Sequence, residues 1–370
     1  MSKKITIHKE SKPIYDIVIE QDYSGLDDLL SALELKGHRA LIVTDSNVEV
    51  HYAQKVYKIL YQHASFVDIL ALPPGESYKE LNTVQQIYSC LINHQFDRKD
   101  FLFALGGGVI GDMTGYAAAT YLRGISFVQL PTSLLSMVDS SIGGKTGVDF
   151  QNYKNMIGAF YQPKAVYMNL SVLNTLPDRE FYSGFGEIIK HGLILDESYY
   201  GYLKENSEKA LDRDYDVLEE IIYRSCHIKQ QVVEEDPFER GQRAILNFGH
   251  TIGHSIEKVM DFSMLHGECV AVGIAAASFI SCKRGLIALE KLNDIIHLLE
   301  SYHLPSAITL QEQNMIYDSI LKTIKNDKKM EAGTIKFILL QKIGEAFIDK
   351  TVTDEELLSA IKYIMGVQLL

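Results

Sequence analysis

The sequence predicts an α/β domain with a parallel sheet over residues 1–178 and a mainly α-helical domain over residues 179–370. A chain of 370 residues is long enough for two hydrophobic cores. In the first half, short apolar runs alternate with helical stretches, which is typical of parallel strands covered by helices. After Asp178 the apolar runs almost disappear, and long amphipathic stretches replace them.

Four apolar runs in the first half predict strands, because each one stops at residues that favour turns. They are 39–44, 66–72, DFLFAL at 100–105 and ISFVQL at 125–130. The stretches that separate them have the spacing of amphipathic helices. These predicted helices are 48–63, 81–94 and 111–121.

The second half predicts four helices and one short return to β structure. The helices are 213–235, 244–260, 268–283 and 288–303, and the β segment is 334–348. The most apolar stretch of the chain, 269–282, is too short to span a bilayer and is rich in Ala and Gly. We therefore expect it to be a helix buried in the core.

Composition narrows the class of partner. The net charge of -12, from 36 basic and 48 acidic residues, argues against nucleic acid or an anionic membrane. A small anionic substrate requires the few basic residues to converge on one pocket. The first twenty residues lack the apolar segment of a secretory signal, and the four cysteines form no CxxC pair. Both features predict a reducing, cytoplasmic location.

A glycine-rich segment, GGGVIG at 106–111, follows a predicted strand and opens a predicted helix. Glycines in that context let the backbone approach the phosphates of a dinucleotide. The alternative is a tight turn without a ligand, and the motif alone favours neither. The next strand ends in Pro131-Thr132-Ser133 instead of the usual acid, so Asp45 is the candidate for binding the ribose.

A long polar segment at 131–158 shows neither helical nor strand periodicity. Polar segments of that length in compact domains are usually functional. Arg123, Lys145 and Lys154 could form a pocket for phosphate or carboxylate. The alternative is a solvated loop with scattered lysines.

Histidines and glutamates in the second half suggest a metal site. His250, His254 and Glu257 fall on one face of a predicted helix, and His266 follows in LHGE. Glu187 lies upstream in FGEIIKHG, with Lys190 three residues later. Two histidines and a glutamate with an open position suit a catalytic Zn²⁺. Spacing alone does not choose between His250 and His254, and the alternative is that these histidines only cap helices.

Seven segments together resemble the 3-dehydroquinate synthase family of the sugar-phosphate cyclase superfamily. They are GGGVIGD, LPTSLLSMVDSSIGGKTGVD, YKNMIGAFYQP, TLPDREF, SGFGEIIKHG, NFGHTIGHSIE and HGECVAVG. The resemblance implies a dehydroquinate synthase-like fold, with a Rossmann-like NAD-binding domain at 1–178 and a metal- and substrate-binding domain at 179–370. It also implies a homodimer, NAD⁺, and Zn²⁺ or Co²⁺.

The reaction that the resemblance implies starts from a phosphorylated sugar acid, 3-deoxy-D-arabino-heptulosonate 7-phosphate. NAD⁺ oxidises a ring hydroxyl, phosphate is eliminated, and the hydride returns. Ring opening and an intramolecular aldol closure then give 3-dehydroquinate, with no net redox change. The pathway would be the shikimate route to chorismate and the aromatic amino acids.

The resemblance also assigns roles to individual residues. The metal ligands would be Glu187, His250 and His266. The catalytic residues would be Lys145, Asp139, Asn155, Lys190 and His254. The other substrate contacts would be Arg123, Lys229, Arg243 and Asn247. The dinucleotide contacts would be Asp45, Asn47, Glu76, Lys79, Gly107, Gly108, Val109, Asp112, Thr132, Ser133, Lys154, Thr175, Leu176 and Glu180.

Some positions depart from the family pattern or leave its details open. Ser133 replaces a common threonine, Asp149 a common asparagine and Tyr153 a frequent glycine. The pair Lys328-Lys329 matches a substrate-contacting element, without showing which lysine faces the substrate. Arg123 is the candidate for reaching the phosphate site of a second subunit.

Three alternatives compete with this interpretation. Another sugar-phosphate cyclase would share the glycine loop and the metal ligands but differ in its substrate. A metal-dependent polyol dehydrogenase would need no phosphate-binding residues and would accumulate NADH. A regulatory protein with a structural zinc would need four ligands, and the sequence offers no natural fourth one.

Overall fold

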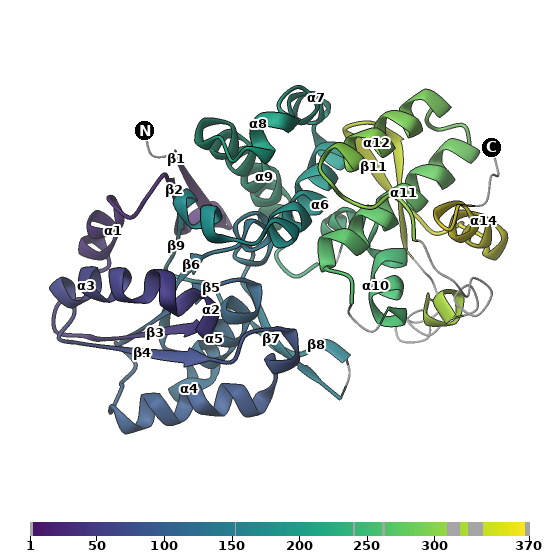
Figure 1. Ribbon diagram of the computed structural model, residues 1–370. Coiled ribbons are helices and arrows are strands. Elements are labelled where there is room, and N and C mark those ends of the chain that lie inside the picture. The colour runs from purple at the N-terminus through teal and green to yellow at the C-terminus, as the bar shows by residue number, and fades with distance from the viewer. Residues whose placement is uncertain are drawn as a thin grey trace. The chain divides into compact units, whose positions relative to one another are not determined.

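The computed structural model describes residues 3–151, 153–239, 241–260, 263–308, 319–324 and 336–366 (Figure 1). The chain divides into two compact units. The first contains residues 1–177 and 218–237, and the second contains 178–217 and 238–370. Residues 218–237 thus group with the first unit although they follow position 178, and the domain boundary at 178 stays a prediction.

The first unit is built on a seven-stranded sheet with the order β1-β2-β9-β6-β5-β3-β4. Its strands are β1 (Lys3–Lys9), β2 (Lys12–Glu20), β3 (Arg39–Asp45), β4 (Phe66–Leu72), β5 (Phe101–Gly106), β6 (Ser126–Pro131) and β9 (Ala165–Asn169). Only the β1–β2 pair is antiparallel, and all other neighbours are parallel. The predicted parallel sheet and its four predicted strands are therefore confirmed.

Helices cover this sheet, as the alternation of apolar runs and helical stretches predicts. They are α1 (Leu26–Ala32), α2 (Ser46–Val48), the π-helical turn η1 (Glu49–Ala53), α3 (Gln54–His63), the short turn η2 (Glu76–Tyr78), α4 (Leu81–Asn93), α5 (Gly108–Thr120), and the turns η3 (Tyr121–Arg123) and η5 (Leu170–Thr175). Alternate residues of β3, Leu41 and Val43, pack with Val84 and Ile87 of α4 and Met113 of α5 in one buried cluster. Burial of this apolar face holds α4 and α5 on the sheet.

The polar segment at 131–158 contains regular structure, although its sequence shows neither helical nor strand periodicity. It forms the turn η4 (Ser136–Ser140) and, with the residues that follow, an antiparallel hairpin of β7 (Lys145–Phe150) and β8 (Tyr153–Phe160). Most residues of β8 are exposed or half-buried, and this leaves no alternation of buried and exposed positions. A strand without that alternation lacks the period of two on which a sequence-based prediction depends.

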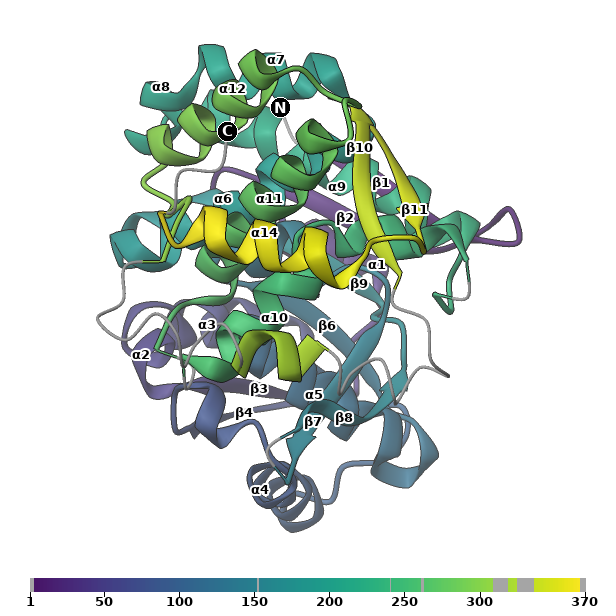
Figure 2. The ribbon, with the colours of Figure 1, turned by 90° about the vertical axis from the view of Figure 1, so that its right-hand side faces the viewer.

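The second unit is mainly helical. Its elements are α6 (Asp178–Leu195), α7 (Glu197–Glu205), α8 (Ser207–Leu211), the turn η6 (Gln242–Asn247), α10 (His250–Val259), α11 (His266–Lys283), α12 (Leu289–Ser301), β10 (Phe337–Lys342), β11 (Glu345–Asp349) and α14 (Asp354–Ile364). Helix α9 (Tyr215–Glu235) starts in this unit and continues in the first. Figure 2 shows the β10–β11 hairpin, which confirms the predicted return to β structure.

Helix α11 is the centre of the second unit. It packs against α6, α10, α12, α14 and β10. Nearly every residue from Gly267 to Ser281 is buried, which confirms the core helix predicted at 269–282. None of the helices in the described ranges combines the length and apolar character that a membrane crossing needs.

The predicted helix 244–260 is interrupted. Residues Gln242–Asn247 form a 3₁₀ turn, and the α-helix begins only at His250. Gly249 separates the two segments with a φ of 80°, in the left-handed region that glycine adopts without a steric penalty. As a result, His250 becomes the first residue of α10 instead of an interior one.

Three helices of the second unit approach one another through glycines. A Cβ atom built on Gly267 of α11 would lie 1.8 Å from the carbonyl oxygen of Ser183 on α6. One built on Gly273 of α11 would lie 1.8 Å from the carbonyl oxygen of Gly249. Because these neighbours are backbone atoms, any side chain at either glycine would force the elements apart.

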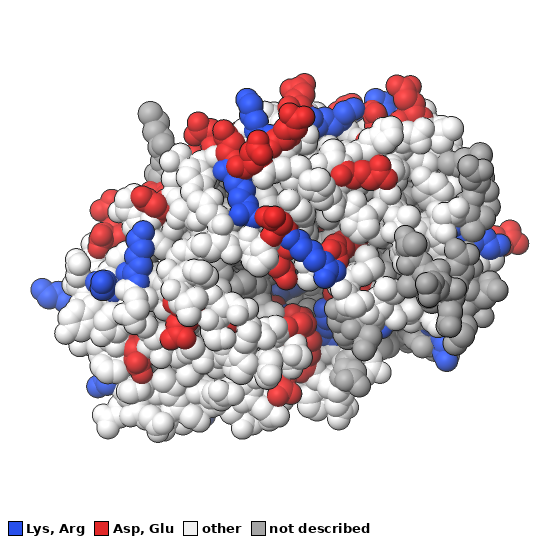
Figure 3. Space-filling model, viewed as in Figure 1, with Lys and Arg blue, Asp and Glu red and all other residues white. Residues whose placement is uncertain are grey.

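Charged side chains of both signs are intermixed on the face shown in Figure 3. This agrees with the composition, in which neither a basic region nor an acidic tail stands out.

Substituting Gly273→Ala should destabilise the protein, because the new methyl group would overlap the Gly249 carbonyl. Overpacking of this kind costs about 1–3 kcal/mol, of which the better helix propensity of alanine returns at most about 1 kcal/mol. The free energy of unfolding, measured with urea, should fall.

Gly201→Ala is the matched control, because Gly201 also lies inside a helix and a methyl group added there would have no atom within 4 Å. It should leave the stability unchanged or raise it by up to about 1 kcal/mol. Equal effects of the two substitutions would contradict the close packing of α11 against Gly249.

Candidate functional site

Three potential metal ligands meet in the second unit. Glu187 lies in the middle of α6, while His250 and His266 are the first residues of α10 and α11. The Nε2 atoms of His250 and His266 lie 3.4 and 3.5 Å from Oε1 of Glu187. Each of the three residues offers one ligand atom, and these atoms lie within 4.8 Å of one another.

The two oxygens of the Glu187 carboxylate have different surroundings. Oε2 accepts a short hydrogen bond from the Lys190 ammonium, one helical turn away on α6. Oε1 is buried and has no hydrogen-bond partner among the described residues. An unsatisfied buried carboxylate oxygen is costly, and a cation between it and the two imidazoles would satisfy it. The residues therefore fit a divalent metal ion.

Charge in this cluster keeps Glu187 ionised. Burial alone would raise the pKa of Glu187, but the Lys190 ammonium and the two histidines outweigh it and hold the pKa well below its ordinary value. Burial and the same ammonium hold the pKa of His250 well below its usual range. At neutral pH Glu187 is thus a carboxylate and His250 is a neutral imidazole, and these are the forms that bind a metal.

Groups behind the two histidines orient their rings. Nδ1 of His250 donates to the carbonyl oxygen of Phe248 at 3.1 Å, which leaves Nε2 facing Glu187. Nδ1 of His266 lies 3.9 Å from a carboxylate oxygen of Glu257. Burial lowers the pKa of His266, but the Glu187 and Glu257 carboxylates outweigh it and raise the pKa to about 9.

His254 belongs to a second, overlapping set. His254, Glu257 and His266 also have ligand atoms within 4.8 Å of one another. The His254 ring stands 5.0 Å from the His250 ring, and its side chain is exposed. Of these two sets, the one formed by Glu187, His250 and His266 contains the unsatisfied buried oxygen, so we favour it for the metal.

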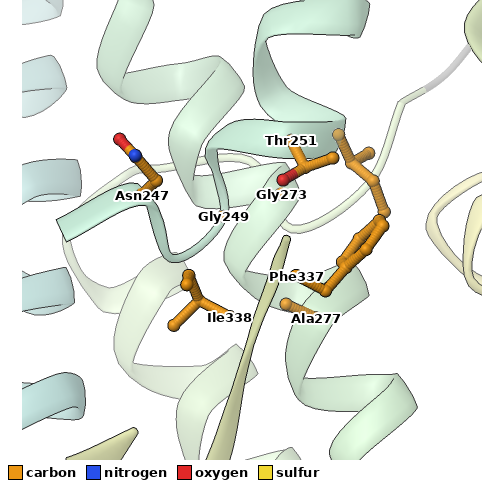
Figure 4. A pocket seen from close by; sticks show the side chains of 8 residues that line it. Asn247, Gly249, Thr251, Gly273, Ala277, Phe337 and Ile338 are labelled. Carbon is orange, nitrogen blue, oxygen red and sulfur yellow. The ribbon is translucent and has the colours of Figure 1, made fainter. Parts of the chain in front are cut away.

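A small pocket lies behind the turn that starts α10 (Figure 4). Thr251 lines it from α10, Ala277 from α11, and Phe337 and Ile338 from β10. Asn247 lines it as well, and its amide donates to Glu239 at 3.0 Å. Arg243, in the same turn as Asn247, is buried. Of the two predicted substrate contacts in this turn, Arg243 is thus buried and Asn247 is half-buried.

The glycine loop lies at the carboxyl edge of the sheet in the first unit. Gly107 caps α5, and Gly108 is its first residue. The neighbouring strand β6 ends beside it, where the amide of Thr132 donates to the carbonyl oxygen of Gly106 at 3.0 Å. A Cβ atom on Gly108 would lie 2.9 Å from Oγ of Ser140. The first residues of α5 therefore supply backbone N–H groups at a helix N-terminus, the kind of group that can bind a phosphate.

Other predicted dinucleotide contacts follow the same edge. Asp45 ends β3 and accepts hydrogen bonds from the amides of Asn47 and Val48, so part of its carboxylate caps α2. Thr175 follows β9 and is hydrogen-bonded to the Tyr52 hydroxyl. The side chains of Val109, Ser133 and Leu176 are half-buried. Glu180, by contrast, lies on the first turn of α6 in the second unit.

A buried lysine organises the polar residues beside the loop. Lys79 Nζ lies 2.7 Å from Asp112 Oδ2 on α5 and 2.6 Å from Asn155 Oδ1 on β8. Burial lowers the pKa of Lys79, but the Asp112 and Glu76 carboxylates outweigh it and raise the pKa. Lys154 Nζ lies 3.6 Å from Glu76. The structure thus brings five predicted residues into one charged cluster.

The remaining predicted residues of the first unit lie on other elements. Lys229 of α9 is buried and makes short hydrogen bonds to the side chain and carbonyl oxygen of Asp139. Lys145 begins β7 and is exposed, as is Arg123 in the turn after α5. Arg123 has a φ of 67°, an uncommon value for a residue with a side chain.

Three supporting groups are not among the predicted site residues. Glu257 falls on the predicted histidine face, but its contact with His266 depends on how α10 and α11 pack. The Phe248 carbonyl that orients His250 is a backbone group and leaves no mark in the sequence. Asp149 accepts from the amide of Asn155 at 2.7 Å, although it replaces the asparagine common in the family. Lys328 and Lys329 lie outside the described residues.

Comparisons with known proteins agree with this geometry. Residues 69–183 match the family described as 3-dehydroquinate synthase N-terminal, and residues 184–330 match 3-dehydroquinate synthase C-terminal. The chain is 43% identical over 363 residues to a 3-dehydroquinate synthase of Acetivibrio thermocellus, covering 98% of both chains.

Two solved structures of related enzymes share the fold. One is a 2-epi-5-epi-valiolone synthase from Streptomyces hygroscopicus with NAD⁺ and Zn²⁺ bound, at a TM-score of 0.87 and 26% identity, covering 97% of this chain and 98% of that one. The other is a 2-deoxy-scyllo-inosose synthase complexed with carbaglucose-6-phosphate, NAD⁺ and Co²⁺, at a TM-score of 0.85 and 25% identity, covering 98% and 100%. Matches to both halves of the family and across nearly the whole chain show that this chain belongs to the 3-dehydroquinate synthase family.

Proposed function

We propose that this chain converts 3-deoxy-D-arabino-heptulosonate 7-phosphate into 3-dehydroquinate and phosphate, and so acts in the shikimate pathway. The observation that carries the proposal is the buried Glu187 carboxylate, whose unsatisfied oxygen faces the Nε2 atoms of His250 and His266. Family membership then selects the reaction among those that such a site could serve.

We propose that Glu187, His250 and His266 hold Zn²⁺ or Co²⁺. Such an ion, when bound, polarises an oxygen of the substrate and lowers the pKa of a hydroxyl group. Phe248 and Glu257 keep the two imidazoles directed toward Glu187. Lys190 neutralises the other carboxylate oxygen, so the carboxylate stays ionised while buried.

We propose that the carboxyl edge of the sheet binds NAD⁺. The cofactor, when bound, accepts a hydride and returns it within one turnover. The Gly107–Gly108 backbone would donate to its phosphates, and Asp45 would accept from its ribose. The remaining contacts would come from Asn47, Glu76, Lys79, Val109, Asp112, Thr132, Ser133, Lys154, Thr175, Leu176 and Glu180.

The substrate carries a phosphate and a carboxylate, so its contacts should be basic or amide groups. The proposed contacts of this kind are Arg123, Lys145, Asn155, Lys190, Lys229, Arg243 and Asn247. Asp139 would accept from substrate hydroxyls while Lys229 holds its carboxylate. His254 is exposed and stands beside His250, where its imidazole could accept or donate a proton at the substrate.

We also propose that the protein works as a homodimer in the cytoplasm. Met156 and Phe160 lie four residues apart on β8 and are 47% and 48% exposed. Large exposed apolar side chains on one face of a strand favour contact with another protein surface. The exposed Arg123 could reach the phosphate site of a second copy.

No disulfide joins the four cysteines, which agrees with a reducing compartment.

The proposed reaction is tested by phosphate release from 3-deoxy-D-arabino-heptulosonate 7-phosphate, with Zn²⁺ and NAD⁺ far below the substrate concentration. Because the hydride returns in each turnover, many phosphates should be released per NAD⁺ without accumulation of NADH absorbance. The product should be 3-dehydroquinate by mass spectrometry.

The other outcomes identify the alternatives. Turnover of a different sugar phosphate, without turnover of the heptulosonate, would indicate another sugar-phosphate cyclase. Stoichiometric formation of NADH from simple polyols would indicate a dehydrogenase. Either result would reject the proposed reaction.

Metal binding should depend on pH through one proton. With a pKa of about 9, His266 is protonated at pH 7 in the metal-free protein, whereas the lowered pKa of His250 leaves its ring neutral. A cation must displace the His266 proton, so its affinity should rise about tenfold per pH unit from pH 6.5 to 8.5. Competition with a chelator of known pH dependence measures this slope. An affinity that does not change with pH would contradict ligation by His266.

A further inference from the structure

A second group of metal-ligating side chains lies in the first unit. Asp68 comes from β4, Cys90 from α4, and His94 is the capping residue that follows α4. One ligand atom of each lies within 4.8 Å of the other two, and all three side chains are half-buried. None of them belongs to the cofactor, substrate or metal contacts proposed above.

The local structure holds these side chains together. Cys90 and His94 are four residues apart, which places both on one face at the end of α4. Asp68 approaches from β4, the edge strand of the sheet, and its Oδ2 lies 2.9 Å from Nε2 of His94. The Phe66 ring packs 5.1 Å from the His94 ring. The aromatic neighbour thus helps to hold the imidazole beside the carboxylate.

We propose that Asp68, Cys90 and His94 bind a thiophilic divalent cation such as Zn²⁺ or Cd²⁺. Thiolate and imidazole donors select these ions over Mg²⁺ and Ca²⁺, which prefer oxygen ligands. Three protein ligands leave a fourth coordination position for water. Because the three side chains are only half-buried, the cation and the water can reach the site from solvent. The site would be separate from the Glu187 set, because each set uses its own residues.

Binding at this site replaces one proton by the cation. Burial and the nearby Asp68 carboxylate raise the pKa of Cys90 to about 11, so the thiol carries its proton when no metal is bound. On binding, a sulfur–metal bond forms and the thiol proton passes to solvent. The negative charge of Asp68 also attracts the cation, and this attraction favours retention of the cation between β4 and α4.

A cation held by β4 and α4 would join the edge of the sheet to the helix that covers it. Because it would bind the folded chain and not the unfolded one, it should stabilise the first unit. Binding at this site would therefore change the stability of the first unit and make that stability depend on thiophilic metals. The site would take no part in the reaction.

The test uses the holoprotein with Zn²⁺ in the Glu187 site, titrated with Cd²⁺ at pH 8 and followed by ultraviolet absorption. A thiolate–cadmium bond gives a charge-transfer band, whereas the oxygen and nitrogen ligands of the Glu187 set give none. We expect the band to saturate at one equivalent of Cd²⁺. Its absence in the wild-type protein would overturn the proposal.

Variants identify the ligands. Cys90→Ser should abolish the band, and His94→Gln should weaken Cd²⁺ binding by at least about tenfold. Cys282→Ser is the matched control, because Cys282 is a half-buried cysteine outside this set, and it should keep the band. A band that persists in Cys90→Ser, or disappears in Cys282→Ser, would contradict the assignment.

Two further measurements separate this proposal from the proposed function. Circular dichroism shows whether each variant is folded, and phosphate release without Cd²⁺ should be unchanged in Cys90→Ser. A failure of the cadmium titration would leave that turnover intact, whereas a failure of the proposed reaction would leave the cadmium band intact.

Discussion

The structure of the second unit depends on the burial of one charged carboxylate. Removing Glu187 from water is favourable only if its charge is compensated. Lys190 compensates one oxygen, and the Nε2 atoms of His250 and His266 lie 3.4 and 3.5 Å from the other without forming a hydrogen bond of normal geometry. The protein alone therefore leaves the group incompletely satisfied, and a bound cation would complete it. The carboxylate that is costly to bury is thus also the group that would bind the catalytic metal ion.

This arrangement requires close packing of helices. His250 and His266 are the first residues of their helices, so their positions follow from where α10 and α11 begin. Gly249 starts α10 through its left-handed backbone, and Gly267 and Gly273 let α11 approach α6 and the Gly249 turn. Ligands on the ends of packed helices are held more rigidly than ligands on loops. In the first unit, the glycine loop is likewise placed by regular elements, between the end of β5 and the start of α5.

Much of this fold is predictable because buried parallel strands and amphipathic helices leave periodic patterns with clear stops. The hairpin of β7 and β8 escapes prediction, since β8 buries neither of its faces. Strands β1 and β2 are also absent from the prediction, although Ile17 and Ile19 alternate as a half-buried strand should. The residue types of the candidate ligands can be recognised in the sequence. The sequence does not show whether His250 or His254 is the ligand. That choice depends on Glu187, 63 positions before His250, and only tertiary packing brings the two together.

The choice between the two overlapping sets is the central claim, and the metal content of two variants tests it most directly. His250→Ala and His254→Ala are purified side by side, and bound Zn²⁺ is counted by mass spectrometry. If Glu187, His250 and His266 hold the ion, His250→Ala should lose it, whereas His254→Ala should retain about one equivalent. Retention of Zn²⁺ in His250→Ala together with its loss in His254→Ala would place the ion on His254, Glu257 and His266 instead.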